Sequence, residues 1–374
     1  MNSRNHKTSW AAAVCGAALL ITIGCGGVGG ESGNDNGPKA IVVWNPFVIA
    51  TLTAREDVRV LFDSTKIPNE IVDSVVVSKS SLEKPGGEAF ACAVIETFYN
   101  NVNKAMADPA KRDETLKAIG QKFADVSLED MEKVVKQTKF YGTPDEGIAV
   151  LTGAELPKTM KTVVGFCESH GIVDQKPSLG FGDAEKAPDA ALRFDASYIE
   201  KVKKGDTGTP SSAPPTFSLA WSEYPSWSVF GVADVYGIIN RKKGELGPIE
   251  KKWGVDIELK EAEYDPCLAM YGAGQCDAVC ITNMDILQPS LGRPGVMVLP
   301  TSTSFGADAC IVTSDIKTVE DLKGVKVHGL EKSVSEYCFV RNLELLNQAE
   351  KDYTFSNMDP AAAALAMQQA AVSD

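Results

Sequence analysis

Short apolar runs typical of β-strands alternate with helix-like runs between Phe217 and Cys310, and this alternation restricts the fold more than any other feature of the sequence. The β-type runs are FSLAW, VDIELKEAEY, QCDAVCITNMD and GVMVLPTSTSFGADAC. Strands that alternate with helices favour an open α/β sheet. We therefore expect an α/β protein whose other parts are arranged around this stretch.

Polar side chains gather where three of these predicted strands end. In an open α/β sheet the carboxyl ends of neighbouring strands converge on one crevice, and ligands bind there. We therefore expect these residues to contact a ligand. They are Trp221, Ser222, Glu223 and Tyr224 after the first strand, Asn283 and Asp285 after the third, and Ser302 and Ser304 in the fourth.

The length and composition indicate a soluble globular protein of about two domains. The chain has 374 residues, of which 44% are hydrophobic and 23% are charged, so a large core is possible. Its formal net charge is −13. This charge argues against nucleic acid or an anionic membrane surface as the main partner, because both attract clustered Lys and Arg.

Residues 1–25 differ from the rest and are typical of a secretory signal. A basic stretch precedes an apolar run that is too short to span a membrane. The run ends in TIGC, which resembles a bacterial lipobox, although Thr22 stands where Leu is usual. The resemblance implies lipidation of Cys25, followed by a flexible tether at residues 26–37. We expect a periplasmic protein anchored to a bacterial membrane as a lipoprotein.

The seven cysteines after the leader do not suit a disulfide framework. They are scattered through predicted strands and helices, and their number is odd. Cys276 and Cys280 fall on the same face of one predicted strand, where a free cysteine packs as a small apolar residue. A metal site would need more soft ligands, and only His170 and His328 are available after the leader. We expect buried thiols, no metal and no cofactor.

The rest of the chain continues the α/β pattern. Further predicted strands are KAIVVWNPF, VRVLFDS, IVDSVVVS, VKVHGL and YTFSNM. Helical patterns cover residues 88–107, 111–123, 127–137, 159–171, 196–204 and 334–347. A last helix begins with Asp359 as N-cap and Pro360 at its first position. A stretch rich in Gly, Ser, Thr and Pro at 205–215 predicts an exposed linker.

The resemblance of this chain to a known family extends over nearly all of the chain after the leader and is carried by five segments: WSEYPSW, GQCDAVCITNMD, STSFGADA, DLKGVKVHGLEKSVSEY and VVWNPF. Together they resemble the periplasmic solute-binding proteins of ABC importers of the nitrate, sulfonate and taurine type. WSEYPSW and TNMD are most similar to binding proteins encoded near urea carboxylase genes. The resemblance implies a type II periplasmic-binding-protein-like fold, in which two α/β lobes close on a solute by hinge motion.

The order of these segments departs from the family, because the segment like WSEYPSW comes first there and the one like VVWNPF comes later. Joining Asp374 to Pro38 supplies the strand missing after the last helix, and joining Gly37 to Asp206 makes a continuous tether. We therefore interpret the chain as circularly permuted, with a variant topology as the alternative. The predicted parts are a signal peptide at 1–25, a tether at 26–37, the C-terminal part of lobe 2 at 38–75, a return to lobe 1 with C-terminal helices at 76–204, a linker at 205–216, the lobe 1 core at 217–308 and the N-terminal part of lobe 2 at 309–374.

The resemblance places a solute site between the lobes and adds candidates to those at the strand ends. They are Trp227, Asp308, Glu331, Ser333, Ser335, Trp44 and Asn45. Structural roles are the alternative for several candidates. Ser333 and Glu336 match a capping box, Asp285 and Asp308 could cap the helices that follow, Trp227 could be helix core, and Trp44 could pack under the hinge.

These residues leave the charge of the solute open. Free helix amides after Ser333 favour a small anion such as nitrate, a sulfonate or taurine. Several carboxylates would repel an anion, whereas carboxylates mixed with Trp and Tyr suit a small cation or a neutral solute rich in N–H groups. We therefore favour urea, a guanidinium-like compound or another small amine.

An enzyme and a sensor domain are the competing classes. Pyrimidine-synthesising enzymes share the two-lobe architecture, but they are cytosolic and depend on His and Cys residues that this sequence does not reproduce. No nucleophile elbow, phosphate loop or His-centred triad is visible in the sequence. We expect a binding protein rather than an enzyme. Its expected partners are a small-molecule solute, ABC permease subunits and a lipid anchor, with no nucleic acid, and the protein is expected to be a monomer.

Overall fold

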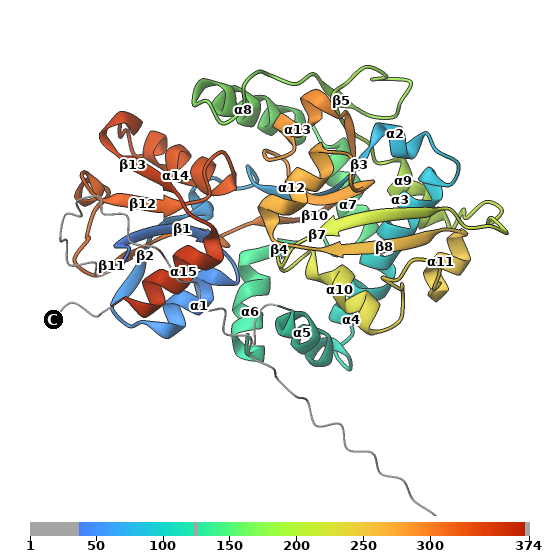
Figure 1. Cartoon of the computed structure of the whole chain (residues 1–374), viewed down its shortest axis with the longest axis horizontal. Helices are drawn as coiled ribbons and strands as arrows, with labels where there is room; N and C mark the ends of the chain where they lie inside the picture. The colour runs from blue at the N-terminus through green and yellow to red at the C-terminus, as the bar shows by residue number, and fades with distance from the viewer. Residues whose placement is uncertain (1–36, 123–125, 371–374) are drawn as a thin grey trace, which may run out of the picture. The chain divides into compact units, whose positions relative to one another are not determined.

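The computed structural model describes residues 37–122 and 126–370. The predicted signal peptide, the lipidation site Cys25 and nearly all of the predicted tether lie outside these residues. Two β-sheets organise the described part of the chain (Figure 1). We call the larger sheet with its helices lobe 1 and the smaller sheet with its helices lobe 2. The predicted α/β class and the two-lobe arrangement are confirmed.

Lobe 2 is built on five strands in the order β13-β12-β1-β11-β2. Their bounds are β1 Ala40–Trp44, β2 Val58–Asp63, β11 Asp308–Thr313, β12 Lys326–Gly329 and β13 Thr354–Asn357. β1 is parallel to β12 and antiparallel to β11. The first strand of the described chain therefore lies between two strands from its last quarter, which Figure 1 shows as blue between orange.

Strand β1 forms because its side chains can be buried on both faces of the sheet. All five residues of AIVVW are buried. Ile41 and Val43 pack in one apolar cluster with α1 (Phe47–Ala54) and α15 (Pro360–Gln369). The other face of β1 packs on α14 (Val334–Leu345). An unbroken apolar run is typical of a strand covered on both faces, and this prediction is confirmed.

Lobe 1 is built on strands in the order β5-β6-β10-β3-β9-β7-β8, with β4 paired to β10. Their bounds are β3 Val72–Ser78, β4 Thr138–Phe140, β5 Leu179–Phe181, β6 Leu192–Phe194, β7 Thr216–Trp221, β8 Asp256–Glu261, β9 Ala278–Thr282 and β10 Gly295–Ser304. β7 runs parallel to both β8 and β9, whereas β3 is antiparallel to β9 and β10. The carboxyl ends of β7, β8 and β9 therefore lie at one edge of the sheet, as predicted.

Two connections join the lobes. β10 ends at Ser304 and β11 begins at Asp308 in the other sheet, while β2 ends at Asp63 and β3 begins at Val72. The predicted lobe boundary at residue 75 is wrong, because it falls inside β3, which pairs with lobe 1 strands along its whole length. The boundary predicted after residue 308 is one residue late, because Asp308 opens β11. Sequence alone could not show that IVDSVVVS changes sheet, since a crossing strand has the same apolar pattern as its neighbours.

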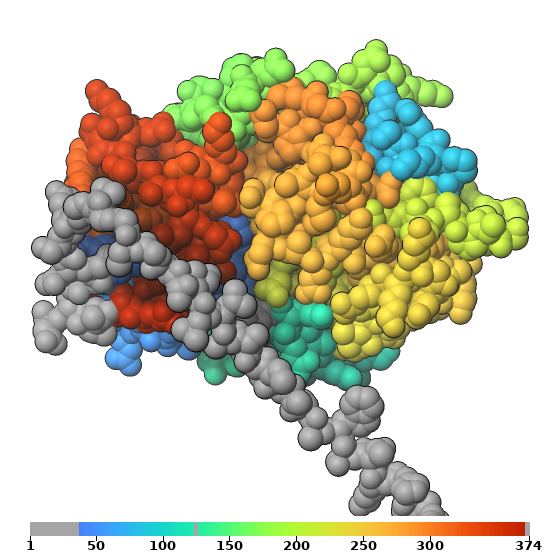
Figure 2. All heavy atoms as spheres, viewed as in Figure 1, coloured from blue at the N-terminus to red at the C-terminus, as the bar shows by residue number. Residues whose placement is uncertain are grey.

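The helices of lobe 1 lie against its sheet or extend from it. They are α2 Lys79–Leu82, α3 Gly87–Glu96, α4 Lys104–Ala107, α5 Arg112–Gln121, α6 Leu128–Gln137, α7 Pro144–Thr152, α8 Glu155–Ser169, α9 Ser197–Lys204, α10 Ser228–Val235, α11 Pro248–Trp253, α12 Tyr264–Gly272 and α13 Leu287–Gly292. The predicted helix at 88–107 is confirmed, with a π-helical segment between α3 and α4 at Thr97–Asn103. Residues 205–215 form the predicted exposed linker between α9 and β7 (Figure 2, yellow-green).

The predicted start of α15 is confirmed, because its N-cap side chain accepts a hydrogen bond from a free backbone amide of the first turn. The Asp359 carboxylate accepts a hydrogen bond from the Ala362 amide at 3.0 Å. The capping box predicted at the start of α14 is wrong. Ser333 accepts from the Ser335 amide at 3.2 Å, and Glu336 accepts from the amide of Lys332 instead of that of Ser333.

Candidate functional site

A small cavity lies at the carboxyl edge of the lobe 1 sheet, where the two lobes meet. Its empty volume is about 230 Å³ including its open side, and the space that a water molecule can occupy is about 10 Å³. Lobe 1 and the crossing strand β3 supply most of the wall, and lobe 2 supplies three residues. The lining residues are Trp44, Ile71, Asp73, Tyr224, Trp227, Tyr264, Thr282, Asp308 and Val334.

The lobes are in contact around this cavity. The ring of Trp44, from lobe 2, meets the ring of Tyr264, from lobe 1, edge-on with a centroid distance of 5.5 Å. On the face drawn in Figure 2, atoms of lobe 2 (red and orange-red) touch those of lobe 1 (yellow and orange). A space of about 10 Å³ is close to the minimum for one water molecule. A larger solute therefore needs the walls to move apart.

Four aromatic rings form one side of the cavity, and each touches the next. Trp227 stacks on Tyr264 with a centroid distance of 5.4 Å and an interplanar angle of 19°. Tyr224 lies 4.8 Å from Trp227, and Trp44 contacts Tyr264 from the other lobe. Aromatic faces carry partial negative charge and attract cations. We call these four rings the aromatic wall.

Two carboxylates, Asp73 and Asp308, line the cavity, and both are buried. Asp73 lies in β3 and accepts a hydrogen bond from the Ser302 hydroxyl. Asp308 is the first residue of β11, and its amide donates to the Ser304 hydroxyl at 3.2 Å. Among the described residues that line the cavity, none is Lys, Arg or His. The cavity wall thus has negative charge without a cationic partner.

A third buried carboxylate, Asp285, lies directly behind the wall. It accepts hydrogen bonds from Tyr264 Oη at 2.6 Å and from Thr282 Oγ1 at 2.8 Å. Because both donors line the cavity, Asp285 fixes the orientation of Tyr264 and adds negative charge behind it. The alternative roles of Asp285 and Asp308 as helix caps are wrong, because Ile286 precedes α13 and Asp308 begins a strand.

Burial raises the pKa of all three carboxyl groups. The pKa of Asp308 rises to about 7, and that of Asp285 rises to about 6 although Tyr264 and Thr282 oppose the rise. Burial also raises the pKa of Asp73 well above its usual value, and the charges of Asp308 and Asp285 raise it further. Asp285 and Asp308 therefore change their ionisation in the range from weakly acidic to neutral pH.

Two hydrogen-bond donors of the aromatic wall have no partner in the described part of the chain. They are Trp227 Nε1 and Tyr224 Oη, and both atoms are buried; the Tyr224 hydroxyl lies near enough to Asp73 to lower the pKa of that carboxyl group. Buried polar atoms normally have partners. These two could donate to a bound solute or to water.

The structure brings five of the predicted site residues to the cavity or directly behind it: Trp44, Tyr224, Trp227, Asp285 and Asp308. Ser302 and Ser304 bind lining carboxylates or their backbone, as described above. Glu223 is an exposed residue outside the cavity. Partial desolvation of its carboxyl group raises its pKa, and the charges of Glu263 and Glu261 add to the rise. The ring of Trp221 packs against Gly231 in α10.

Most of the other predicted residues make structural contacts within the described part of the chain. Asn283 accepts from the Val72 amide at 2.9 Å and donates to the Glu70 carbonyl, which holds the start of β3. Asn45 donates to the Gln137 side chain at 2.8 Å. Three others hold α14: the exposed Glu331 bonds to Asn357, Ser333 caps the helix and Ser335 is buried in its first turn. Ser222 is buried and does not line the cavity.

Sequence reasoning missed Asp73, Tyr264 and Thr282. Asp73 is a lone carboxylate in an otherwise apolar strand, VDSVVVS, and a charge in such a run is itself a signal. Tyr264 is the last residue of the run VDIELKEAEY. The end of this strand was not among the predicted site residues. Both residues could have been found by looking for polar side chains in segments that the sequence pattern predicts to be buried.

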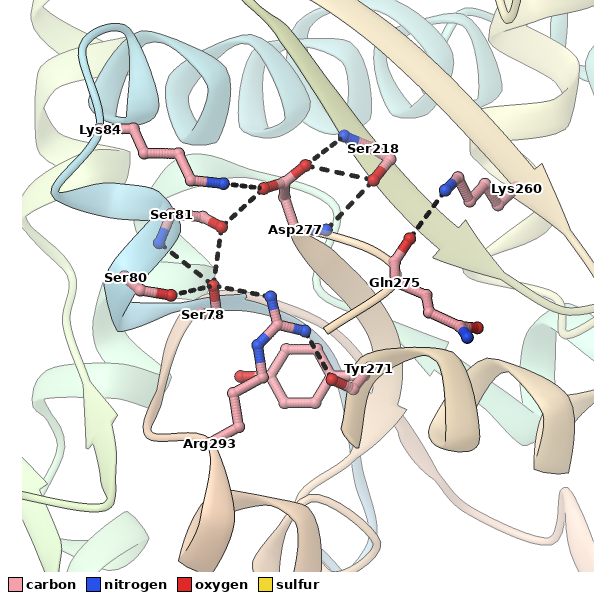
Figure 3. A network of polar contacts seen from close by, with 10 residues as sticks. All are labelled: Ser78, Ser80, Ser81, Lys84, Ser218, Lys260, Tyr271, Gln275, Asp277 and Arg293. Atoms are coloured by element: carbon pink, nitrogen blue, oxygen red, sulfur yellow. Dashed lines mark hydrogen bonds and ion pairs between the residues drawn. The ribbon is translucent and has the colours of Figure 1, made fainter. Parts of the chain in front are cut away.

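A second polar network lies at the opposite edge of the lobe 1 sheet (Figure 3). The Asp277 carboxylate accepts from Lys84 at 2.8 Å, from Ser81 at 2.7 Å and from the Ser218 amide at 2.9 Å. Burial alone would raise the pKa of Asp277, but these donors outweigh it and hold the pKa below its usual value. Because both carboxylate oxygen atoms of Asp277 have hydrogen-bond partners, we interpret this network as structural.

A larger hollow, of about 1440 Å³ including open space, lies on the surface of lobe 1. Its lining includes the exposed side chains of Lys104, Lys111 and Glu114. Solvent screens such charges, so this hollow is a weaker candidate than the buried cavity.

The described residues contain seven cysteines, all of them buried free thiols, and burial raises the pKa of each. This agrees with the predicted packing role. Within the same residues, no group of three or more His, Cys, Asp and Glu side chains is arranged to hold a metal ion. No helix in this part of the chain combines the length and apolarity needed to cross a membrane.

No known protein family model matches this chain, and no curated protein matches its sequence. Among solved structures, a dipeptide-binding protein from Pseudoalteromonas sp. SM9913 in complex with Met-Leu is 8% identical with a TM-score of 0.29, over 72% of this chain and 52% of that chain. A periplasmic oligopeptide-binding protein from Borrelia burgdorferi is 8% identical with a TM-score of 0.27, over 74% of this chain and 49% of that chain. This chain spans about half the length of these two structures. Likenesses of this size do not establish a shared ligand, so the function is inferred from the cavity.

Proposed function

We propose that this protein captures a small nitrogenous solute, foremost a guanidinium-like or amine cation, in the cavity between its lobes. In this proposal it is the extracytoplasmic solute-binding component of an ABC importer. The transport role comes from the sequence resemblance, and the class of solute comes from the cavity. Permease subunits as partners and a lipid anchor at Cys25 belong to the same proposal.

One observation carries the choice of solute. Asp73 and Asp308 are buried at an aromatic-lined cavity whose described lining residues include no cation. A buried carboxylate without a cationic partner is unstable by several kcal/mol and takes up a proton instead. A cationic solute would supply the missing charge, and its N–H groups would supply the missing hydrogen-bond donors.

The aromatic wall supports a cation independently of the carboxylates. Trp227 and Tyr264 stack on each other, and Trp44 from lobe 2 contacts Tyr264 edge-on. A cation over a desolvated Trp or Tyr ring gains about 2 kcal/mol. A planar guanidinium group can use an aromatic face and a carboxylate at the same time.

The size of the cavity favours a solute of few heavy atoms. Drug-sized ligands occupy pockets of about 300–1,000 Å³, whereas this cavity has room for about one water molecule. A dipeptide, such as the one bound to the Pseudoalteromonas protein, would need a much larger space. Urea, guanidinium and methylamine all have fewer than about five heavy atoms and need only a small opening of the lobes.

A small anion such as nitrate is disfavoured by the same groups. Asp73, Asp308 and Asp285 would repel it in a region of low dielectric constant. The first turn of α14 is the anion site that the sequence suggested, but the Ser335 amide there already binds Ser333. The Val334 amide lies close enough to Asp285 to lower its pKa.

Isothermal titration calorimetry at pH 8 would test the class of solute. The panel is guanidinium, methylammonium, urea, nitrate and taurine, each titrated into the protein without its leader. We expect saturable binding of guanidinium or methylammonium and none of nitrate. Asp308→Asn should abolish cation binding. The matched variant Asp352→Asn changes an exposed carboxylate of lobe 2 outside the cavity and should leave cation binding unchanged. Tight binding of nitrate or taurine would refute the proposal.

We propose in addition that the order of the chain is circularly permuted. The topology of lobe 2 supports this, because α15 packs on β1 and β1 is parallel to β12. If α15 led directly into β1, the segment from β12 through β13 and α15 to β1 would be a run of parallel strands with helical crossovers, the usual connection in such sheets. The ends of the described chain also meet, since a Cβ atom built on Gly37 would lie 2.5 Å from Cβ of Ala370.

A rearranged chain tests the permutation. It begins at Thr216, continues to Asp374, is joined to Pro38 and ends at Gly205. We expect it to fold and to bind the same solute with unchanged affinity, because both new ends adjoin the exposed linker at 205–215. A control chain that begins inside the sheet, at Ala278, should not fold. Failure of the first chain together with success of the second would refute the permuted arrangement.

A further inference from the structure

A second pocket in lobe 1 is lined by donors from three elements. Its empty volume is about 620 Å³ including open space, and it lies between α2, the loop before β6 and α9. The donors are Arg193 from β6, Lys79 from α2 and Tyr198 from α9. The remaining lining residues are Leu82, Glu83, Ala184 and Pro188.

Arg193 is the unusual residue in this pocket. Its side chain is only 6% exposed, and its single ionic partner among the described residues is Asp195, with 3.5 Å between Nη2 and Oδ2. Arg193 Nε is buried and has no hydrogen-bond partner in that part of the chain. A guanidinium has five N–H donors, and burying them without acceptors is costly. The guanidinium group of Arg193 therefore lacks hydrogen-bond acceptors among the described residues that line the pocket.

The other two donors also have capacity to spare. Lys79 Nζ donates one hydrogen bond, to the Pro188 carbonyl at 2.7 Å, and an ammonium group has three N–H donors. Burial raises the pKa of Tyr198 to about 12, so its hydroxyl stays protonated and can donate at neutral pH. Two carboxylates oppose an anion here. Asp195 lies behind Arg193, where it also accepts from the Ser197 amide, and Glu83 is exposed at the edge.

We propose that this pocket is a binding site for a small organic monocarboxylate, held by Arg193, Lys79 and Tyr198. The planar fork of a guanidinium matches the two oxygen atoms of a carboxylate. Leu82, Ala184 and Pro188 offer apolar contact to a short hydrocarbon part. A doubly charged phosphate fits less well, because the negative charges of Glu83 and Asp195 offset the positive charges of Arg193 and Lys79.

This site is separate from the cavity between the lobes. β6 pairs with Gly295–Met297, at the amino end of β10, whereas the cavity lies near Ser302 at the other end of the strand. Five residues of an extended strand span about 17 Å. Occupation of the carboxylate pocket therefore does not require the lobes to open, and the proposal does not depend on the identity of the solute in the cavity.

Saturation-transfer NMR with butyrate as the probe tests the proposal at constant ionic strength, with phosphate and chloride as competitors. We expect saturable butyrate binding that chloride does not displace. Tyr198→Phe, which keeps the ring, and Lys79→Met should each weaken it about tenfold. Arg193→Met should abolish it, but the first two variants decide the outcome if this one does not fold. Lys186→Met, an exposed change on the neighbouring loop, should have no effect.

Two results would overturn the proposal. One is the absence of saturable butyrate binding to the unaltered protein. The other is binding that Tyr198→Phe and Lys79→Met leave unchanged. Displacement of butyrate by phosphate at equal or lower concentration would overturn the assignment to a monocarboxylate.

Discussion

The affinity of this protein for a guanidinium ion should fall steeply as the pH is lowered from 8 to 5. Guanidinium keeps its charge over this range, so any change comes from the protein. The pKa of Asp308 is about 7 in the ligand-free structure, and the bound cation requires the ionised form. At pH 8 almost all of Asp308 is ionised, whereas at pH 5 only about 1% is. Affinity should therefore fall about 100-fold from this residue alone.

The raised pKa of Asp73 acts in the same direction. Calorimetry at pH 5, 6, 7 and 8 measures the affinity, and titration in two buffers with different heats of ionisation counts the protons. At pH 6 about 90% of Asp308 is protonated, so binding should release about one proton. Neutral urea has no charge to exchange for that proton, and its affinity should vary far less with pH. Guanidinium affinity that is constant or rises towards pH 5 would refute this reasoning.

The variant Asp308→Asn provides the internal control for stability. A carboxyl group whose pKa is raised on folding destabilises the folded state as the pH rises from its unfolded pKa through its folded pKa. The rise from 3.8 to about 7 corresponds to about 4 kcal/mol above pH 7. Without solute, Asp308→Asn should therefore raise the melting temperature at pH 8 and change it little at pH 4. A lower melting temperature at pH 8 would show that the carboxylate has a partner in the folded protein.

Three further predictions follow from other parts of the structure. Trp227→Leu should weaken guanidinium binding about 10- to 30-fold by removing a desolvated ring, with urea binding as the comparison in the same calorimeter. Glu223→Ala should leave the affinity unchanged within about twofold, because this exposed carboxylate lies outside the cavity and solvent screens it; a large loss would show that Glu223 reaches the solute. Asp277→Asn should lower the stability by about 1–3 kcal/mol near neutral pH. Because the pKa of Asp277 is held low by its partners, this contribution should disappear as the pH falls through that pKa. Thermal unfolding measures it, and chemical denaturation is unsuitable because urea and guanidinium are themselves candidate solutes.

The fold was predictable because each level of the sequence indicates the same architecture. Apolar runs separated by helical patterns specify strands and helices, and polar residues at strand ends specify one edge of a sheet. Tyr224 and Asp285 were predicted at the site for this reason. What the pattern does not contain is the pairing of distant strands, so the change of sheet at Val72 could not be read from it.

The errors at the site have a physical cause. After β7 ends at Trp221, the chain turns, and the direction of each side chain depends on that turn and not on composition. Tyr224 and Trp227 face the cavity, whereas Glu223, between them and the strand, is exposed. Asp73 was missed for the opposite reason, because it lies inside a strand and not at its end. Its burial beside the cavity follows from the antiparallel pairing of β3 with β9, which places Asp73 opposite Thr282.

In the proposed function, the placement of the charges couples solute binding to closure of the lobes. Asp308 belongs to lobe 2, Asp73 lies in the strand that crosses into lobe 1, and Asp285 lies behind the lobe 1 wall. The charges of Asp308 and Asp285 raise the pKa of Asp73 in the closed structure, so ionised carboxylates oppose one another when the lobes meet. A cation between them replaces repulsion with attraction, and it thereby stabilises the closed form over the open one. Protonation at acidic pH removes the same repulsion without providing a site for the cation. The closed state and the bound state are therefore favoured together only when the carboxylates are ionised and a cation is present, which is the behaviour that a selective solute receptor needs.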